Sequence, residues 1–475
     1  MAVAVSEIPV DFRGDGAGTA ELTWGQLQIW RTACQTGRTM NIVTPVPLPE
    51  GTHLADMVAL LRFILSRHPA LRSRLRFAGG PSGSAHPWQV VAESGEVPLQ
   101  IADIGDGDPS AAAEELRSRY ELTRFDYENE FPVRMGIVRQ SGVLRVMVVG
   151  FSHVMVDGAA LAALTRDTEH LDRATGGAMP GARGLDPLDL ARVQSGPAGR
   201  RQTGRCMRYW EAQLGRLTSW RNDRPVDPRE PRFRELAVDS PAMGIGLRAI
   251  EARARTSSSY VLLAAYAVAV ARVLGRNPSV AQIAVSNRFR PGFADAVLQL
   301  SQPGICVVDA AAATFDEVVG RAMTAATTAS FFGYYHPVER DRLLDRVADA
   351  MSRPVDISWH LNDRRTLLGA QDSGGAPTGR EAETALRDAL PRTRLYWDRA
   401  QPTFDGSLFM QVDAGRGPTI SSRRATLDDG LPAVRMEVWT DTHQFALDQV
   451  ETLVREMEAI VVEAAFDAKV PTGVG

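Results

Sequence analysis

The segment that most constrains the fold is a strongly apolar run that ends in a short turn with one histidine and one aspartate. The run Val143 to Ser152 is rich in β-branched residues, which predicts a strand. A second apolar segment, Val133 to Arg139, precedes it across a short polar stretch with a glycine, as in a β-hairpin. Good helix formers follow Asp157, so this residue is a natural N-cap. The pattern predicts a hairpin, a turn and a helix in succession.

The turn places His153 at the end of the predicted strand and Asp157 four residues later. A histidine held at a rigid strand end suits a general base, because its ring titrates near neutral pH. There is also a purely structural interpretation. A histidine after an apolar strand is often a hydrogen-bonded core residue, and an aspartate before a helix is often only its cap. Spacing alone leaves both interpretations open.

The pattern His153-x-x-x-Asp157-Gly158 resembles the H-H-x-x-x-D-G signature of condensation domains and related acyltransferases, which share the chloramphenicol-acetyltransferase fold. Other segments resemble further motifs of this family, occur in the family's order and together cover nearly the whole chain. These segments are Leu22–Trp30, Ser66–Leu75 (R-H-x-x-L-R), Arg208–Leu214 (Y-W-x-x-x-L), Ser259–Arg272, Asn287–Arg290 (G-R-x-R-like) and Pro303–Val308 (I-G-x-F-V-N-T). The resemblance is to condensation domains of nonribosomal peptide synthetases and their free-standing relatives.

The sequence departs from the family pattern at three points. Ser152 replaces the first histidine of the signature, although the family credits the chemistry to the second, which is His153 here. The I-G-x-F-V-N-T match ends in Val308 and Asp309 instead of asparagine and threonine. A D-F-G-W-G motif, which marks the simpler coenzyme A-dependent branch, is not recognisable.

The resemblance implies an α/β fold of two chloramphenicol-acetyltransferase-like lobes, arranged as a V-shaped pseudo-dimer with a central channel. We expect the first lobe over residues 21–178, a linker between the lobes over 179–235, and the second lobe over 236–475. Residues 1–20, rich in Gly, Ala and Asp, are predicted to be a disordered tail.

The resemblance also implies acyl transfer from a phosphopantetheine thioester to an amine or hydroxyl. His153 would take or orient the proton of the nucleophile, and the Gly158 N–H would stabilise the oxyanion at a helix start. Asp157 is predicted to be structural: the family pattern pairs it with Arg67, with Arg72 as the second choice.

Four further positions are assigned by alternation or by resemblance. Ser152 is expected to be a packing position beside the active site, because strand alternation turns it away from His153. By resemblance, the substrate channel is predicted to include Asn287 and Arg288. His360, on a strand, is a further channel candidate, and a core histidine is at least as good an interpretation of it. Two tryptophans, Trp359 and Trp439, are expected in the core.

Composition restricts the class of partner and the compartment. The net charge of −4, from 53 basic and 57 acidic residues, does not call for nucleic acid or an anionic membrane. The three cysteines form neither a metal-ligand nor a disulfide pattern, as expected in a reducing cytoplasm. The longest apolar run, Tyr260 to Ala271, is shorter than the roughly 20 residues that span a bilayer. We see no signal peptide and expect a monomeric cytoplasmic protein without a bound metal or cofactor.

No carrier or adenylation segment is recognisable, so the acyl donor is expected on a separate acyl or peptidyl carrier protein. The acceptor is expected to be a small-molecule amine or alcohol, which could itself be carrier-bound. One alternative is a coenzyme A-dependent O- or N-acyltransferase of the same fold. A second alternative is a catalytically silent protein that recruits an enzyme to a synthetase.

Overall fold

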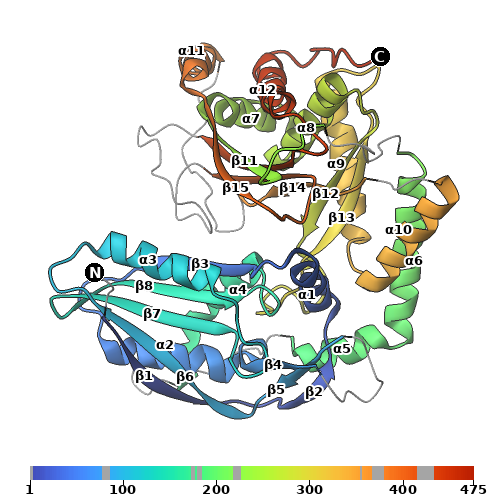
Figure 1. Ribbon diagram of the computed structural model, residues 1–475. Helices are drawn as coiled ribbons and strands as arrows, with labels where there is room; N and C mark the ends of the chain where they lie inside the picture. The colour runs from blue at the N-terminus through green and yellow to red at the C-terminus, as the bar shows by residue number, and fades with distance from the viewer. Residues whose placement is uncertain are drawn as a thin grey trace. The chain divides into compact units, whose positions relative to one another are not determined.

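The computed structural model describes residues 4–77, 86–172, 177–178, 185–217, 226–352, 356–365, 379–414 and 433–475. These residues form two α/β units, each with its own sheets and helices (Figure 1). Unit 1 combines the chain up to Arg200 with a later segment, Ser286–Ser301, which we call the inserted segment. Unit 2 holds Arg201–Val285 and the described residues after Ser301. The predicted two-lobed α/β class is confirmed, and the V shape and channel stay predictions.

Unit 1 contains a five-stranded sheet in the order β1-β6-β7-β8-β3 and a three-stranded sheet in the order β2-β5-β4. Its strands are β1 (Ala4–Arg13), β2 (Gly18–Glu21), β3 (Asn41–Pro47), β4 (Ser73–Arg76), β5 (Trp88–Val91), β6 (Ser94–Asp103), β7 (Val133–Gln140), β8 (Val143–Ser152), β9 (Leu171–Asp172) and β10 (Gly177–Ala178). Its helices are α1 (Trp24–Thr36), α2 (Leu54–Arg67), α3 (Pro109–Leu122), α4 (Gly158–Asp167) and α5 (Pro187–Ser195).

The predicted hairpin is the centre of the larger sheet. Strands β7 and β8 pair antiparallel, and the turn between them places Ser141 and Gly142 at φ values of 47° and 83°. Helix α3 packs on this hairpin through a small core that includes Val138 and Val148. The strand β3 lies at the sheet edge, as its two prolines predict.

The prediction of a disordered tail over residues 1–20 is wrong. Strand β1 pairs with β6 over ten residues, from Ala4 opposite Asp103 to Arg13 opposite Ser94. Strand β2 pairs with β5. The apolar side chains of Val10 and Phe12 are buried. Strand pairing therefore orders this segment, although its Gly- and Asp-rich composition suggests disorder.

Unit 2 is a seven-stranded sheet in the order β13-β12-β14-β16-β17-β11-β15. Its strands are β11 (Phe233–Ser240), β12 (Ser279–Val285), β13 (Gln302–Val308), β14 (Trp359–Asp363), β15 (Arg394–Gln401), β16 (Leu408–Ala414) and β17 (Val434–Asp441). Its helices are α7 (Pro241–Ala254), α8 (Ser258–Leu274), α9 (Phe315–Phe331), α10 (Pro337–Met351), α11 (Gly379–Ala389) and α12 (Leu447–Ala464). Helix α6 (Pro197–Leu214) carries the chain from unit 1 into unit 2.

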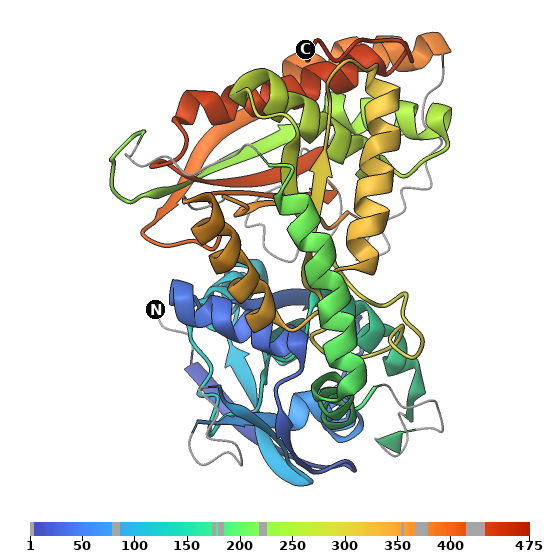
Figure 2. The ribbon, with the colours of Figure 1, turned by 90° about the vertical axis from the view of Figure 1, so that its right-hand side faces the viewer.

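Helices α7, α8 and α12 gather over one face of this sheet (Figure 1), and α9 runs along β13 (Figures 1 and 2). Helix α8 is the centre of the core, with every residue from Val261 to Ala271 buried. The predicted second lobe, 236–475, corresponds to the sheet and helices of unit 2. It is not continuous in sequence, because the inserted segment belongs to unit 1. The described part of the predicted linker is mostly helical, since α5 and α6 lie within it.

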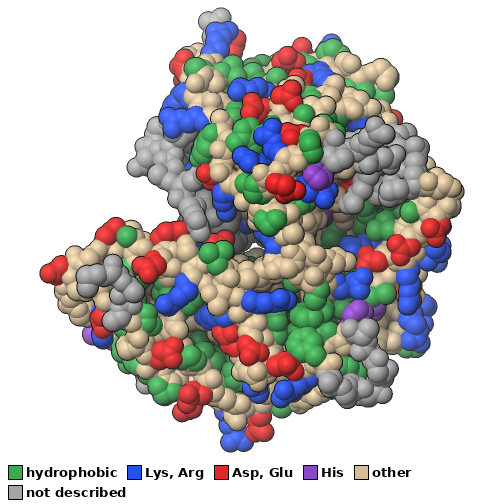
Figure 3. Space-filling model, viewed as in Figure 1, with side chains coloured by type: hydrophobic (Ala, Val, Ile, Leu, Met, Phe, Trp, Pro, Cys, Tyr) green, Lys and Arg blue, Asp and Glu red, His purple; other side chains and the backbone are tan. Residues whose placement is uncertain are grey.

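Acidic and basic side chains are intermixed on the face of the molecule that Figure 3 displays. Within the described ranges, no single helix is long and apolar enough to cross a membrane. Helices α7 and α8 meet that criterion only as a pair, and they are bent by 114°.

Candidate active site

The turn after β8 is fixed by its own backbone. The Ser152 carbonyl accepts hydrogen bonds from the amides of Met155 and Val156, at 3.0 and 3.2 Å. Helix α4 then begins at Gly158, and Asp157 is its N-cap, with Oδ1 accepting the Ala160 amide at 2.8 Å. The strand, the turn and the capped helix that the sequence predicts are all confirmed.

His153 is held by one hydrogen bond that also sets its protonation pattern. Its Nδ1 lies 2.8 Å from the carbonyl oxygen of Val156. Because a carbonyl oxygen can only accept, Nδ1 carries the hydrogen in the neutral ring, and the lone pair is on Nε2. The side chain is half-buried, and Nε2 makes no hydrogen bond to any residue in the described part of the chain. This is the tautomer and the exposure that a general base requires.

Asp157 is buried, at 1% exposure, and both carboxylate oxygens are occupied. Oδ1 lies 2.9 Å from Nη2 of Arg288, and Oδ2 lies 3.0 Å from Nη1. Oδ2 also accepts the Leu300 amide at 3.0 Å, the Ser301 amide at 2.9 Å and the Ser301 hydroxyl at 2.8 Å. A carboxylate with this many donors acts as an anchor and is not free to take a proton from substrate.

The electrostatics of Asp157 agree with an anchoring role. Burial alone would raise the pKa of Asp157, but attraction to Arg288 and the hydrogen bonds from Arg288, Leu300 and Ser301 outweigh it. The pKa of Asp157 therefore lies below its ordinary value, and the group is ionised at neutral pH.

All the partners of Asp157 except the Ala160 amide come from the inserted segment. Asn287, at φ 60°, ties the two ends of the segment together because its Nδ2 donates to the Leu300 carbonyl at 3.0 Å. The Gln299 amide donates to the Met155 carbonyl at 2.8 Å, which fastens the segment to the turn after β8. A small core formed by Ala70, Leu190, Ala296, Leu298 and Leu300 packs the segment into unit 1.

The predicted pair of Arg67 and Asp157 is wrong. Arg67 donates to Asp167 instead, with Nη2 at 2.9 Å from Oδ1, and His68 Nε2 lies 3.0 Å from the same carboxylate. Asp157 and Asp167 stand at opposite ends of α4, about 15 Å apart at 1.5 Å per residue. Arg67, at the end of α2, reaches only the far end of α4. The second choice, Arg72, donates to the carbonyls of Ala92 and Asp15.

The other predicted positions separate into two groups. Asn287 and Arg288 belong to the inserted segment, where Arg288 holds Asp157 and the carbonyls of Ala296 and Leu298. Arg288 is thus an anchor within unit 1, and its place in a channel, like that of Asn287, stays a prediction. His360 lies in unit 2, where it stacks on Phe409 with ring centroids 5.1 Å apart. Its role in a channel stays a prediction.

Ser152 is completely buried beside the hydroxyl of Tyr127, whereas the adjacent His153 is half-buried. This placement supports a packing role for Ser152, which remains a prediction. Trp359 lies in the helix-covered core of unit 2, as expected. Trp439 is also buried, but it lies on the opposite face of the sheet.

Sequence reasoning missed Ser301 and the Leu300 amide, because a main-chain donor leaves no trace in residue type. The sequence feature that could have indicated these partners is an arginine motif, Asn287–Arg290, followed about ten residues later by the polar residues Gln299 and Ser301. The described residues contain no group of three His, Cys, Asp or Glu side chains that could hold a metal ion.

Comparison with known proteins defines the class. A family model for the condensation domain matches residues 28–329, well over half of the sequence, so the chain belongs to the condensation-domain family. Cyclosporin synthetase simA of Tolypocladium inflatum is 27% identical over 437 residues, which cover 83% of this chain but 3% of the synthetase. The chain spans only 2–5% of the length of the curated relatives it matches.

Solved structures share the fold. The condensation domain described for chain release from the enacyloxin polyketide synthase has a TM-score of 0.69 at 17% identity, over 96% of this chain and 84% of that one. The X-domain from teicoplanin biosynthesis has a TM-score of 0.66 at 18% identity, over 98% of both chains. Condensation domains have two chloramphenicol-acetyltransferase-like lobes, which agrees with the two α/β units described above.

Proposed function

We propose that this chain transfers an acyl or aminoacyl group from a carrier-protein phosphopantetheine thioester to an amine or hydroxyl, in natural-product biosynthesis. The family supports condensation chemistry, and the observation that carries the proposal to specific residues is the Nδ1 contact of His153 with the Val156 carbonyl. It leaves Nε2 as a proton acceptor on a turn that the inserted segment holds in place.

In the proposed reaction, the nucleophile attacks the thioester carbonyl while its proton passes to His153 Nε2. The C–S bond then breaks, and the departing thiolate takes up a proton to give the free phosphopantetheine thiol. The Gly158 amide is the first of α4, where helix amides have no partner within the helix, so it is a candidate donor to the developing oxyanion. A thioester is already activated, so positioning of the two substrates contributes much of the rate.

Asp157 and Arg288 are positioning residues in this proposal. Their ion pair fixes the start of α4, and with it both the Gly158 amide and the backbone that orients His153. Ser301 and the Leu300 amide complete the same support.

The choice of donor is tested by supplying the same acyl group in two forms. The purified chain is incubated with an acyl-loaded carrier protein and, in parallel, with the acyl-coenzyme A, together with a panel of amines and alcohols. Mass spectrometry then follows the acylated acceptor. The proposal predicts product from the carrier-bound donor. Product from acyl-coenzyme A alone would favour the coenzyme A-dependent alternative.

The silent-recruitment alternative is kept because of the X-domain likeness, and a solved structure describes a complex of the X-domain with OxyB. Retention of His153 in the base-competent tautomer, and of a fully bonded Asp157, favours catalysis. A chain that binds a synthetase enzyme but yields no acylated product from either donor would support recruitment instead.

A further inference from the structure

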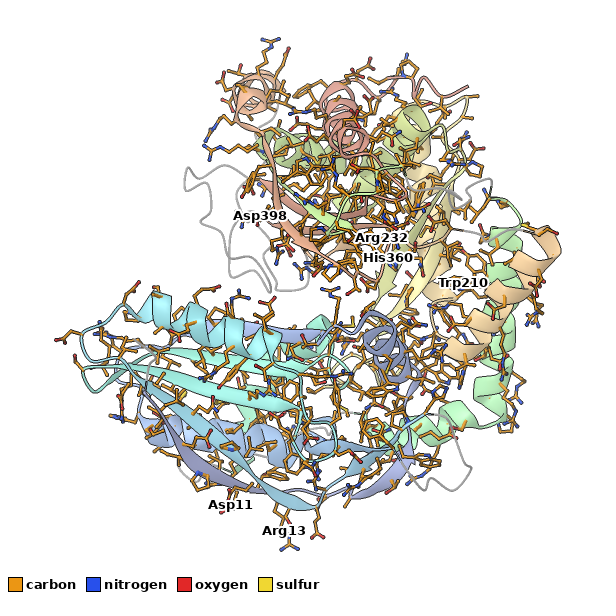
Figure 4. The ribbon with its side chains drawn as sticks, viewed as in Figure 1. Asp11, Arg13, Trp210, Arg232, His360 and Asp398 are labelled. Atoms are coloured by element: carbon orange, nitrogen blue, oxygen red, sulfur yellow. The ribbon has the colours of Figure 1, made fainter. Side chains whose placement is uncertain are left out.

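The seven-stranded sheet of unit 2 has a second face that is polar and aromatic. Opposite residues on neighbouring strands present their side chains on the same face, so strand pairing defines rows across the sheet. One row runs through Gln282, His360, Phe409, Trp439 and Glu235. The labelled His360 lies on the side of the sheet away from α7, α8 and α12 (Figure 4).

The next row places Glu437 between Gln411 and Ala237. The residues on either side of Glu437 in β17, Met436 and Val438, point into the helix-covered core, so Glu437 faces the other way. Its side chain is only 8% exposed. A carboxylate that is buried to this extent normally has its hydrogen bonds satisfied.

Glu437 has few such partners. Its Oε2 is 3.3 Å from the Gln411 amide nitrogen and 3.5 Å from Nη2 of Arg399. Both distances are longer than those of charge-assisted bonds. Among the described residues, no donor reaches its Oε1. Arg399 also donates a much shorter hydrogen bond to Glu235, so its interaction with Glu437 is weak.

The surroundings of Glu437 penalise its negative charge. Burial raises its pKa to about 7, and the nearby carboxylates of Glu235 and Asp413 act in the same direction. Arg399 and Arg364 lower the pKa but do not compensate. In the following row, Asp413 is bonded to Arg364 and Asp239 to Arg435, so these arginines are engaged with other carboxylates.

Next to this carboxylate lies an aromatic cluster, formed by Phe409 and Trp439 of the first row and by Phe404, which precedes β16. Phe404 stacks on Trp439 at 4.9 Å between centroids and meets Phe409 edge-on at 5.4 Å. Phe404 and Phe409 are only half-buried, and the Arg399 guanidinium lies over the Trp439 ring, 5.4 Å from its centroid, so this face already holds one cation against an aromatic ring. Aromatic faces attract cations, and an adjacent carboxylate strengthens that attraction.

We propose that Glu437 and the Phe404–Phe409–Trp439 cluster bind a positively charged alkylammonium group of the acceptor. A bound ammonium would donate to Oε1 of Glu437 and would compensate the buried negative charge. The inference deepens the proposed function, on which it rests, because it names a chemical feature of the acceptor: a basic group next to an apolar or aromatic one.

The test measures binding without any acyl donor, by titration calorimetry with three matched probes. These are 2-phenylethylammonium, the neutral 2-phenylethanol and the anionic phenylacetate. We expect the ammonium to bind best, and to bind about tenfold more tightly at about pH 8 than at about pH 6, because the ionised fraction of a group with a pKa of about 7 rises by that factor. Glu437→Gln should weaken ammonium binding about tenfold or more at the higher pH and abolish its pH dependence.

The control variant is Glu383→Gln, which removes an exposed carboxylate on α11. It should bind the ammonium as the wild type does. The proposal is overturned if the wild type does not bind the ammonium, if it prefers phenylacetate, or if Glu437→Gln binds the ammonium unchanged while its melting temperature shows that it is folded. Because no donor is present, a chain that binds the ammonium but transfers no acyl group would contradict the proposed function and leave only the ammonium-binding site standing.

Discussion

At the residue scale, the two polar residues of the signature have different tasks. His153 keeps one ring nitrogen unengaged, whereas Asp157 has both oxygens bonded and is nearly inaccessible. We expect the largest loss of stability where the Asp157–Arg288 ion pair is broken, because removal of one partner leaves a buried charge uncompensated.

We therefore expect Asp157→Asn and Arg288→Gln each to lower the free energy of unfolding by about 3–5 kcal/mol and to reduce activity with it. Chemical denaturation of the single and double variants gives the coupling. The double variant should lose less than the sum of the singles, since the two side chains share one interaction.

Arg67→Gln is the matched comparison, because Arg67 is bonded to Asp167 at the other end of α4. Its effect should add to that of Asp157→Asn. Strong coupling of Arg67 with Asp157, and none of Arg288, would restore the pairing that the family pattern suggested and contradict the geometry.

Glu437 gives a prediction on pH and stability. Its pKa is raised from 4.5 to about 7 in the folded state, so the folded protein keeps a proton that the unfolded chain loses. This contribution to stability is complete below about pH 4.5 and is lost as the pH rises through about 7. Relative to the wild type, Glu437→Gln should therefore gain on the order of 2–3 kcal/mol between about pH 4.5 and about pH 8.

Thermal or denaturant unfolding of both proteins across this pH range measures the difference. The two stability curves should converge at the acid end and separate toward neutral pH. Parallel curves would mean that Glu437 is ionised in the folded protein like an exposed carboxylate.

At the element scale, helix α1 shapes the site by leaving room for the inserted segment. A Cβ atom placed on Gly25 would lie 2.4 Å from the Gln299 carbonyl oxygen, far inside a permitted contact. Gln299 is also the residue whose amide holds the Met155 carbonyl. The close approach of α1 thus supports the turn that carries His153, and so does Gln26 of α1, whose Nε2 donates to Met155 Sδ at 3.3 Å.

We predict that Gly25→Ala displaces the inserted segment, destabilises the protein by about 1–3 kcal/mol and lowers turnover. Gly320→Ala is the control, because Gly320 lies within α9 and has nothing within 4 Å of the added Cβ. It should be neutral or stabilising by up to about 1 kcal/mol. Melting temperatures and turnover of the two variants test this prediction. Equal effects at both positions would contradict the proposed role of Gly25 in the contact with the inserted segment.

At the scale of the whole molecule, local patterns predicted local structure well. The strand that ends at Ser152 and the helix that Asp157 caps follow directly from apolar patterning and the capping residue. The first strand was missed because a Gly-Asp-Gly stretch follows it and its burial comes from pairing with β6, about 90 residues away.

The part of the candidate site that lies in one continuous segment could be predicted from the sequence. The contacts that come from a distant segment could not. The positions of His153, Asp157 and Gly158 follow from one strand and one helix start. The partners of Asp157 come from a segment some 130 residues later, and the choice between Arg67 and Arg288 depends on how that segment folds back into unit 1. Periodicity carries no information about such a contact.

The most direct test of the account is single-turnover acyl transfer from a loaded carrier protein by the wild type and by His153→Ala. The variant should lose about two to four orders of magnitude in rate, the range expected for a general base, while its melting temperature stays that of the wild type. A folded His153→Ala protein that transfers the acyl group at nearly the wild-type rate would contradict the assignment of His153 as the base.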